Sequence, residues 1–205
     1  MSTSPVPLHQ DPQCGPSIAT PDYGHGVFTV SCSTVISAPP QKCLDIVLDG
    51  SAYPDWNTFC TAVTIDHVPS PPDASWADAP PELQHLLTQD SALFPGVDFK
   101  FDCVMKEGAA PTKTALHVSR LEVLHRGGHA GYRVAWTMRG SPHFVLRTER
   151  VQEFIPTEDG SETEYYCYET FGGILAYVVR LAVGSQVADG FGRWMTGLKE
   201  KAERA

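Results

Sequence analysis

The sequence predicts an α+β fold in which a curved antiparallel sheet of about six to seven strands wraps around one long C-terminal helix. Between residues 28 and 171, apolar and polar residues alternate in successive short segments, the period of a half-buried strand. After residue 173 the apolar residues recur at spacings of 3 and 4 instead, which predicts a helix. Apart from a short helix in an insertion described below, only two short helical segments stand among the strands, so helices and strands are largely segregated along the chain.

The strand pattern is clearest at residues 28–36 and 97–105, where every second side chain is apolar. Turns rich in Gly, Pro or Asp separate most of the segments, and Asp159-Gly160 is a strong hairpin signal. The segments predicted as strands are 28–36, 59–68, 97–105, 113–125, 132–138, 143–155 and 163–171.

Two short helices are predicted after the first strand. Pro40 suits the first turn of a helix over residues 41–48, Asp49-Gly50 ends it, and a second helical turn covers 51–57. Beyond Gly172-Gly173, a helix of about 25–30 residues is predicted, with an inward apolar face formed by Ile174, Tyr177, Leu181, Gly184, Ala188, Phe191, Met195 and Leu198. One helix cannot fill the concave side of a strongly curved sheet, so we expect a cavity that binds an apolar ligand.

The domain organisation is expected to be simple. Residues 1–25 are rich in Ser and Pro and predict a flexible leader without the features of a signal peptide, so we expect a cytoplasmic protein. Residues 26–205 predict a single domain. It carries an insertion at about residues 69–95, with a short helix at 81–88, that forms a lid or is disordered.

Composition argues against several partners. The net charge of −9 is spread along the chain and does not favour nucleic acid, and no apolar run approaches the length of about 20 residues that a stable membrane insertion needs. The six cysteines occur singly, and the eight histidines lack metal-site spacing. Because no nucleotide-binding or serine-hydrolase motif is present either, we expect no metal and no cofactor. The oligomeric state is left open.

Five short motifs occur in an order typical of one fold: residues 36–40 (Ile-Ser-Ala-Pro-Pro), 53–57 (Tyr-Pro-Asp-Trp-Asn), 132–136, 169–173 (Glu-Thr-Phe-Gly-Gly) and 191–199. In these motifs the chain resembles the SRPBCC superfamily, the START-like or pollen-allergen-like helix-grip proteins, and in particular its polyketide-cyclase and coenzyme-Q-binding branch. The resemblance covers about residues 27–202 without the insertion. It implies a helix-grip fold with a hydrophobic ligand cavity, and structural roles for Trp56 and Asn57. It carries no universal catalytic motif, because function resides in sites grafted on the fold.

The hairpin at Asp159-Gly160 fixes the register of the two strands that it joins. It places Arg150 opposite Glu169, in a row that also pairs Phe154 with Tyr165, Gln152 with Cys167 and Thr148 with Phe171. Because this row is largely apolar and continues to Leu146 and Phe144, we expect it to face inward, with Tyr166 and Tyr168 on the outer face.

Two interpretations of Arg150 and Glu169 remain open. Buried charges persist mainly when they are paired, so the two residues form a structural ion pair in one interpretation. In the other, the pair orients the polar end of a ligand, with Glu169 as general base and Arg150 stabilising an oxyanion or enolate. Two interpretations of Tyr177 also remain open: its hydroxyl could donate a hydrogen bond to a ligand carbonyl, or the side chain could pack in the core with its hydroxyl bonded within the protein.

The functional prediction is a cavity that binds a small, largely apolar molecule and catalyses a cofactor-free cyclisation, dehydration or isomerisation of a polyketide-like substrate, as a cyclase, lyase or isomerase. The alternative is a non-catalytic carrier or sensor for a lipid, quinone or other small metabolite. The residues expected to line the cavity beside Arg150 and Glu169 are Phe28, Val30, Phe99, Phe101, Met105, Tyr132, Val134, Trp136, Thr148, Gln152, Phe171, Tyr177, Leu181 and Phe191.

Overall fold

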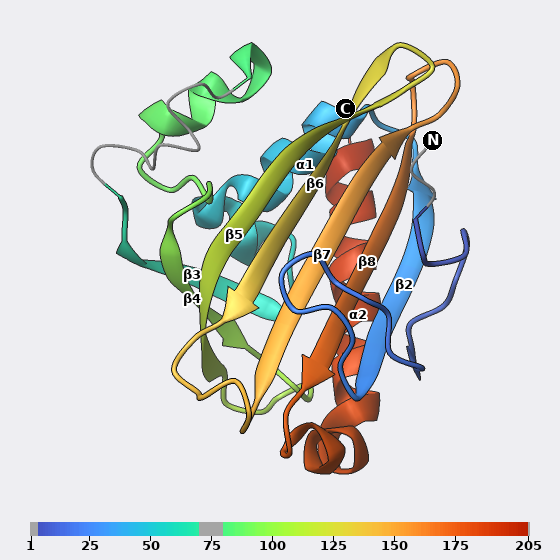
Figure 1. Ribbon diagram of the computed structural model, residues 1–205. Coiled ribbons are helices and arrows are strands. Elements are labelled where there is room, and N and C mark those ends of the chain that lie inside the picture. Colours follow the sequence, from blue (N-terminus) through green and yellow to red (C-terminus); the bar gives the residue numbers. More distant parts are fainter. Residues whose placement is uncertain (1–3, 70–79, 205) are drawn as a thin grey trace.

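A single antiparallel sheet of eight strands lies against one long helix in the computed structural model, which describes residues 4–69 and 80–204 (Figure 1). The strands are adjacent in the order β1-β2-β8-β7-β6-β5-β4-β3. Their bounds are β1 (Gln13–Gly15), β2 (Phe28–Ile36), β3 (Cys60–His67), β4 (Asp98–Cys103), β5 (Thr112–Arg126), β6 (His129–Met138), β7 (Arg147–Pro156) and β8 (Thr163–Gly172). The helices are α1 (Pro40–Leu48), η1 (Gly50–Asp55), η3 (Pro81–Thr88) and α2 (Ala176–Glu203). The α+β prediction is therefore confirmed.

All seven predicted strands are present, and the eighth strand is the short β1, which pairs with β2 at the edge of the sheet. The largest shift in a strand boundary occurs where residues 143–155 were expected to be extended. The N–H groups of Val145 and Leu146 both donate to the carbonyl of Pro142, so this stretch is a turn and β7 begins only at Arg147. Phe144, expected on the inward face, lies in that turn and is 70% exposed.

The predicted short helices match the structure closely. Pro40 occupies the first turn of α1, and the carboxylate of Asp49 accepts a hydrogen bond from the N–H of Ser51 where η1 begins. In the predicted insertion, η3 spans the residues expected to be helical and buries Leu83 and Leu86. The stretch 70–79 of that insertion lies outside the described residues.

The inward face of α2 differs from the prediction. Its buried residues are Ala176, Gly184, Val187, Ala188, Gly190, Phe191, Trp194, Leu198 and Ala202. Ile174, Tyr177 and Leu181 are 66%, 62% and 89% exposed, so all three were wrongly placed on the inward face. The physical reason is that the first turns of α2 extend beyond the end of the sheet (Figure 1), where no strand covers the predicted stripe.

Residues 4–25, expected to be a leader, pack against the sheet: β1 pairs with β2 at its edge, and stretches on either side of β1 lie over the outer face. Val6 and Ile18 pack against a small apolar cluster that includes Tyr166 and Tyr168. Both tyrosines are on the outer face, as predicted, but this segment buries them. Such a cover explains how an antiparallel sheet can carry aromatic side chains on both faces.

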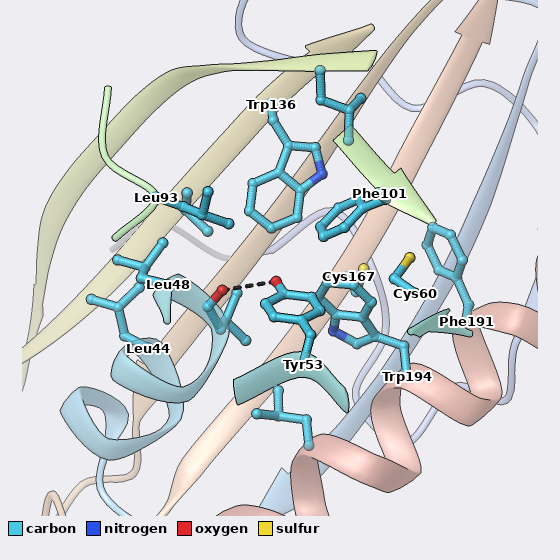
Figure 2. Packing of buried hydrophobic residues seen from close by; sticks show 14 of the residues in the cluster. Leu44, Leu48, Tyr53, Cys60, Leu93, Phe101, Trp136, Cys167, Phe191 and Trp194 are labelled. Carbon is cyan, nitrogen blue, oxygen red and sulfur yellow. Dashed lines mark hydrogen bonds between the residues drawn. The ribbon is translucent and has the colours of Figure 1, made fainter. Parts of the chain in front are cut away.

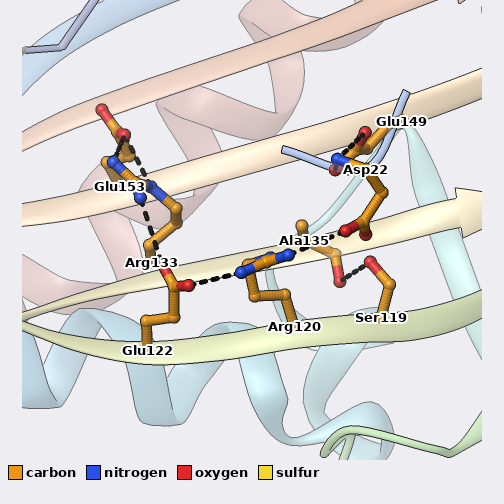
Figure 3. Close-up of polar contacts among 8 residues, drawn as sticks. All are labelled: Asp22, Ser119, Arg120, Glu122, Arg133, Ala135, Glu149 and Glu153. Atoms are coloured by element: carbon orange, nitrogen blue, oxygen red, sulfur yellow. Dashed lines mark hydrogen bonds and ion pairs between the residues drawn. The ribbon is translucent and has the colours of Figure 1, made fainter. Parts of the chain in front are cut away.

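A polar network holds this segment in place (Figure 3). The carboxylate of Glu149, fully buried, accepts hydrogen bonds from the N–H groups of Asp22 and Tyr23. The carboxylate of Asp22 in turn binds Arg120 at 2.9 Å. Burial raises the pKa of Glu149, because removal from water disfavours the charged form of its carboxyl group.

Aromatic side chains from the sheet and from the C-terminal half of α2 meet on the inner face (Figure 2). The ring of Trp194 contacts those of Tyr53, Phe101 and Trp136, with centroids 5.5, 5.7 and 6.2 Å away. The helix approaches closely because Gly190 lacks a side chain: a Cβ there would lie 2.5 Å from the ring of Phe59.

Candidate functional site

The predicted register of β7 and β8 is confirmed, and it brings Arg150 and Glu169 together on the inner face. The Nε and Nη2 atoms of Arg150 lie 2.9 and 2.8 Å from Oε2 of Glu169. The side chains of Arg150 and Glu169 are only 8% and 11% exposed, so the ion pair is buried but keeps a small contact with solvent. A pair of this kind is costly to desolvate and needs further partners to offset that cost.

Aromatic rings surround the guanidinium of Arg150. Its Cζ lies 4.4 Å from the ring centre of Phe191, 5.2 Å from Trp194 and 5.8 Å from Phe59. Burial is the largest influence and lowers the pKa of Arg150, but Glu169 together with the nearby Cys167, Cys60 and Cys103 outweighs it, so the pKa is raised overall. The guanidinium therefore stays charged.

One nitrogen of this guanidinium has no partner. Nη1 of Arg150 is buried and makes no hydrogen bond to any of the described residues. Nε2 of Gln152, two positions along β7 on the same face, is also unpartnered, although Oε1 of that side chain accepts a hydrogen bond from the hydroxyl of Tyr165 at 2.5 Å. Unpartnered buried N–H groups are uncommon and call for an explanation.

Most residues predicted to line a cavity lie on the inner face around this pair. Val30 is directly opposite Glu169, and Trp136 is directly opposite Arg150. Phe28 stacks on Phe171 with ring centres 4.6 Å apart. The others found buried on this face are Phe99, Phe101, Val134, Thr148 and Gln152, and Phe191 of α2 packs against Arg150 from the helix.

Four predicted residues stand apart from the pair. The hydroxyl of Tyr132 donates to Oε1 of Gln41 on α1, and Met105 is half-buried beyond the end of β4. Tyr177 and Leu181 face outward, as described above.

Sequence reasoning missed three side chains close to Arg150 or to the aromatic cluster, namely Trp194, Phe59 and Tyr53. Trp194 follows Val187 and Phe191 at helical spacings of 4 and 3, a signal that the predicted stripe overlooked. Asn57, predicted to be structural, has that role: its Oδ1 accepts hydrogen bonds from the N–H groups of Phe59 and Cys60.

The two open depressions that the structure describes both lie outside this interior, so the cavity expected between the sheet and α2 stays a prediction. A groove of about 1070 Å³ runs along α2 and is lined by Cys14, Trp56, Leu181 and Arg193 among others. A cleft of about 460 Å³ on the outer face contains His117, whose Nδ1 lies 2.7 Å from Oδ1 of Asp98. Leu181 thus lines a groove, but neither Arg150 nor Glu169 lines that groove.

Neither a metal site nor a membrane-spanning helix emerges from the residues that the structure describes. Within 4–69 and 80–204, no three His, Cys, Asp or Glu side chains gather as metal ligands. In the same ranges, no helix has both the length and the hydropathy to cross a bilayer.

No family model matches the sequence. A curated protein of Penicillium oxalicum, described as oxopyrrolidines biosynthesis cluster protein O, is 29% identical over 170 residues, which cover 77% of this chain and 78% of that protein.

Solved structures share the fold at low sequence identity. A START superfamily protein from Mycobacterium smegmatis has a TM-score of 0.55 at 14% identity, covering 85% of this chain and 97% of that one. An aromatase/cyclase from Streptomyces sp. R1128 also has a TM-score of 0.55, at 12% identity, covering 86% of this chain and 93% of that one. The resemblance to the START-like, SRPBCC-type helix-grip proteins is therefore confirmed at the level of the fold.

Proposed function

We propose that the protein binds a small, largely apolar molecule between the sheet and α2, and catalyses its cofactor-free cyclisation, dehydration or isomerisation. The observation that carries this proposal is the buried Arg150–Glu169 pair, in which one guanidinium nitrogen has no partner among the residues that the structure describes. A site for an apolar molecule needs a few polar groups that fix its orientation, and this pair is such a group.

The pair is unusual for a purely structural contact. Replacing a buried ion pair by apolar residues is often neutral or stabilising, so stability alone does not favour its presence. Both side chains retain some solvent contact, so a ligand oxygen of similar size could reach them. The chain places them among Trp136, Phe171 and Phe191, which would hold the apolar body of the ligand.

The chemistry follows from the geometry. Both contacts with Arg150 use Oε2 of Glu169, which leaves Oε1 as the oxygen to accept a proton from a carbon next to a ligand carbonyl. The electrons of that C–H bond would pass to the carbonyl oxygen, and Nη1 of Arg150 would donate a hydrogen bond to the resulting enolate. The enolate carbon would then attack a second carbonyl of the same molecule, whose oxygen would take back the proton held by Glu169, or the enolate would expel a β-hydroxyl group as water with that proton.

A non-catalytic carrier or sensor is the second candidate. The aromatic side chains of Phe101, Trp136 and Trp194 favour it, because they would offer a ligand an apolar surface without any group that reacts. For either role we propose a cytoplasmic setting, supported by six cysteines that are all free thiols.

The test compares Glu169→Gln with wild-type protein, after a co-purifying compound has been identified by mass spectrometry. Glu153→Gln is the matched control, because Glu153 is also buried and paired, with Arg133 at 2.8 Å, but on the outer face. We expect Glu169→Gln to retain binding and lose turnover, and Glu153→Gln to keep both. Binding of an unchanged compound by every form supports the carrier, and full turnover by Glu169→Gln would remove this residue from the mechanism.

A further inference from the structure

We infer that Cys60 and Cys103 form an oxidation site, at which a small hydroperoxide converts their two thiols into one cross-strand disulfide. The cysteines occur singly in the sequence, but the sheet brings these two together. Cys60 is the first residue of β3, Cys103 is the last residue of β4, and the two are directly opposite each other. This thiol pair does not depend on the proposed ligand or its chemistry.

The geometry of the thiol pair suits a disulfide. Sγ of Cys60 lies 3.6 Å from Sγ of Cys103. The N–H of Val104 donates to the carbonyl of Phe59, so the adjacent pair of residues carries the ladder hydrogen bond. Cys60 and Cys103 are therefore a non-hydrogen-bonded pair, whose side chains approach more closely. In such a pair the Cα atoms are about 4.5 Å apart, within the range of roughly 4.4–6.8 Å that a disulfide spans.

The surroundings distinguish the two thiols. The hydrogen bond from Cys60 has the largest effect on the pKa of Cys103 and lowers it. Burial opposes this effect, but Arg150 and Thr114 also favour the thiolate, so the pKa of Cys103 is lowered overall. Burial raises the pKa of Cys60 well above its ordinary value. Cys103 is also the more exposed residue, at 8% against 0%, so it is the thiol that attacks the oxidant.

The reaction balances with the hydroperoxide as the only oxidant. The sulfur of Cys103 attacks one oxygen, the O–O bond breaks, and the other oxygen leaves as water or an alcohol with the thiol proton, which leaves a sulfenic acid. The sulfur of Cys60 then attacks the sulfur of that sulfenic acid. The S–S bond forms, and the hydroxyl group leaves as water with the proton of Cys60. The two electrons that the thiols lose reduce the peroxide bond.

The disulfide would fasten the edge of the sheet. β3 is the edge strand and lies next to β4. The bond would close a loop that spans 43 residues, and closing a loop of this length restricts the unfolded chain and stabilises the folded one. It would also restrain Phe59, the residue before Cys60, whose ring centre lies 5.8 Å from Cζ of Arg150.

A second pair of cysteines provides an internal comparison. Cys32 and Cys167 are directly opposite each other on β2 and β8, and their thiols are hydrogen-bonded. Figure 2 shows Cys167 in the same buried cluster as Cys60. Cys32 and Cys167 are at most 2% exposed, so a hydroperoxide reaches them less readily than it reaches Cys103. We therefore expect this second pair to be oxidised more slowly.

The test exposes the reduced full chain to hydrogen peroxide, alkylates the remaining thiols with iodoacetamide after unfolding, and maps the tryptic peptides without reduction. The variant Cys43→Ser makes the map unambiguous, and its serine can keep the hydrogen bond to Thr163. Residues 43–100 then form a tryptic peptide with Cys60 as its one cysteine, and Cys103 is the one cysteine of peptide 101–106. We expect these two peptides to be linked, in this variant, before Cys32 and Cys167 are oxidised.

Two further variants separate the steps. In Cys60→Ser, dimedone is expected to trap a sulfenic acid on Cys103, whereas Cys103→Ser is expected to give neither an adduct on Cys60 nor a disulfide. Oxidation of the wild-type protein is expected to raise the midpoint of thermal unfolding by about 10 °C, and dithiothreitol is expected to reverse the rise. Both serine variants should lack this rise, and Cys43→Ser should show it.

The inference is overturned if peptides 43–100 and 101–106 stay unlinked, whether both cysteines remain thiols or Cys103 proceeds to a sulfinic acid. A dimedone adduct on Cys60 in Cys103→Ser would overturn the assignment of Cys103 as the attacking thiol. Should either of these serine variants fail to fold, the peptide map of Cys43→Ser still decides. None of these results depends on whether a ligand is bound or transformed.

Discussion

Replacing Arg150 by Met is expected to destabilise the protein by about 3–5 kcal/mol, because it leaves the carboxylate of Glu169 unpaired in an apolar interior. The magnitude follows from burial: the two side chains are 8% and 11% exposed, and two nitrogens of Arg150 lie within 2.9 Å of the carboxylate oxygen. Lys100 and Asp66 form a comparison pair at 2.8 Å in which both side chains are 38% exposed. Lys100→Met is therefore expected to cost at most about 1 kcal/mol.

Urea unfolding followed by circular dichroism measures both effects under identical conditions. The double variant Arg150→Met/Glu169→Met is expected to be more stable than Arg150→Met alone, because no buried charge remains unpaired. A loss below about 1 kcal/mol for Arg150→Met would refute the account of a buried, mutually dependent pair.

Three further predictions concern the surroundings of the site. Gly190→Ala is expected to cost about 1–3 kcal/mol in thermal unfolding, since its Cβ would meet Phe59 at 2.5 Å, whereas Gly15→Ala meets nothing within 4 Å and is expected to be milder; equal losses would contradict this packing. Burial opposes ionisation of Asp22, but hydrogen bonds from Arg120 and Ser119 outweigh it and lower its pKa below 3.8, so its contribution to stability is complete above that pH and is lost as pH falls further. Proteolysis of residues 4–25 should therefore accelerate in acid, and an Asp22→Asn variant should lack this component. Cys14 is the one half-buried cysteine, so one thiol of six is expected to react with Ellman's reagent in the native protein, and Cys14→Ser should abolish that reaction.

The sequence predicted the pairing of Arg150 with Glu169 because a single local signal sufficed. The tight turn at Asp159-Gly160 fixes the register of β7 and β8, and Gly160 adopts the positive φ of 74° that such a turn requires. Once the register is known, the alternation of side chains determines which residues share a face.

Other features depended on tertiary contacts that no local pattern encodes. The stripe containing Tyr177 and Leu181 has helical spacing, yet it is exposed because the sheet ends before it. The short β1 lies in a Pro-rich segment without alternation, so its pairing through Cys14 and Val30 could not be foreseen. How closely Trp136 and Trp194 approach each other depends on the fit of α2 against the sheet, which the periodicity of either element leaves open.

The most direct test of the central claim is an NMR titration of the ¹⁵N-labelled protein with 2-acetylnaphthalene, observing the indole N–H signals of Trp136 and Trp194 and the Nε–H signal of Arg150. Binding between the sheet and α2 predicts that these three signals shift together at one affinity. Shifts restricted to residues of the groove outside α2, such as Leu181 and Thr196, would show that the ligand binds elsewhere and would contradict the proposed role of the Arg150–Glu169 pair.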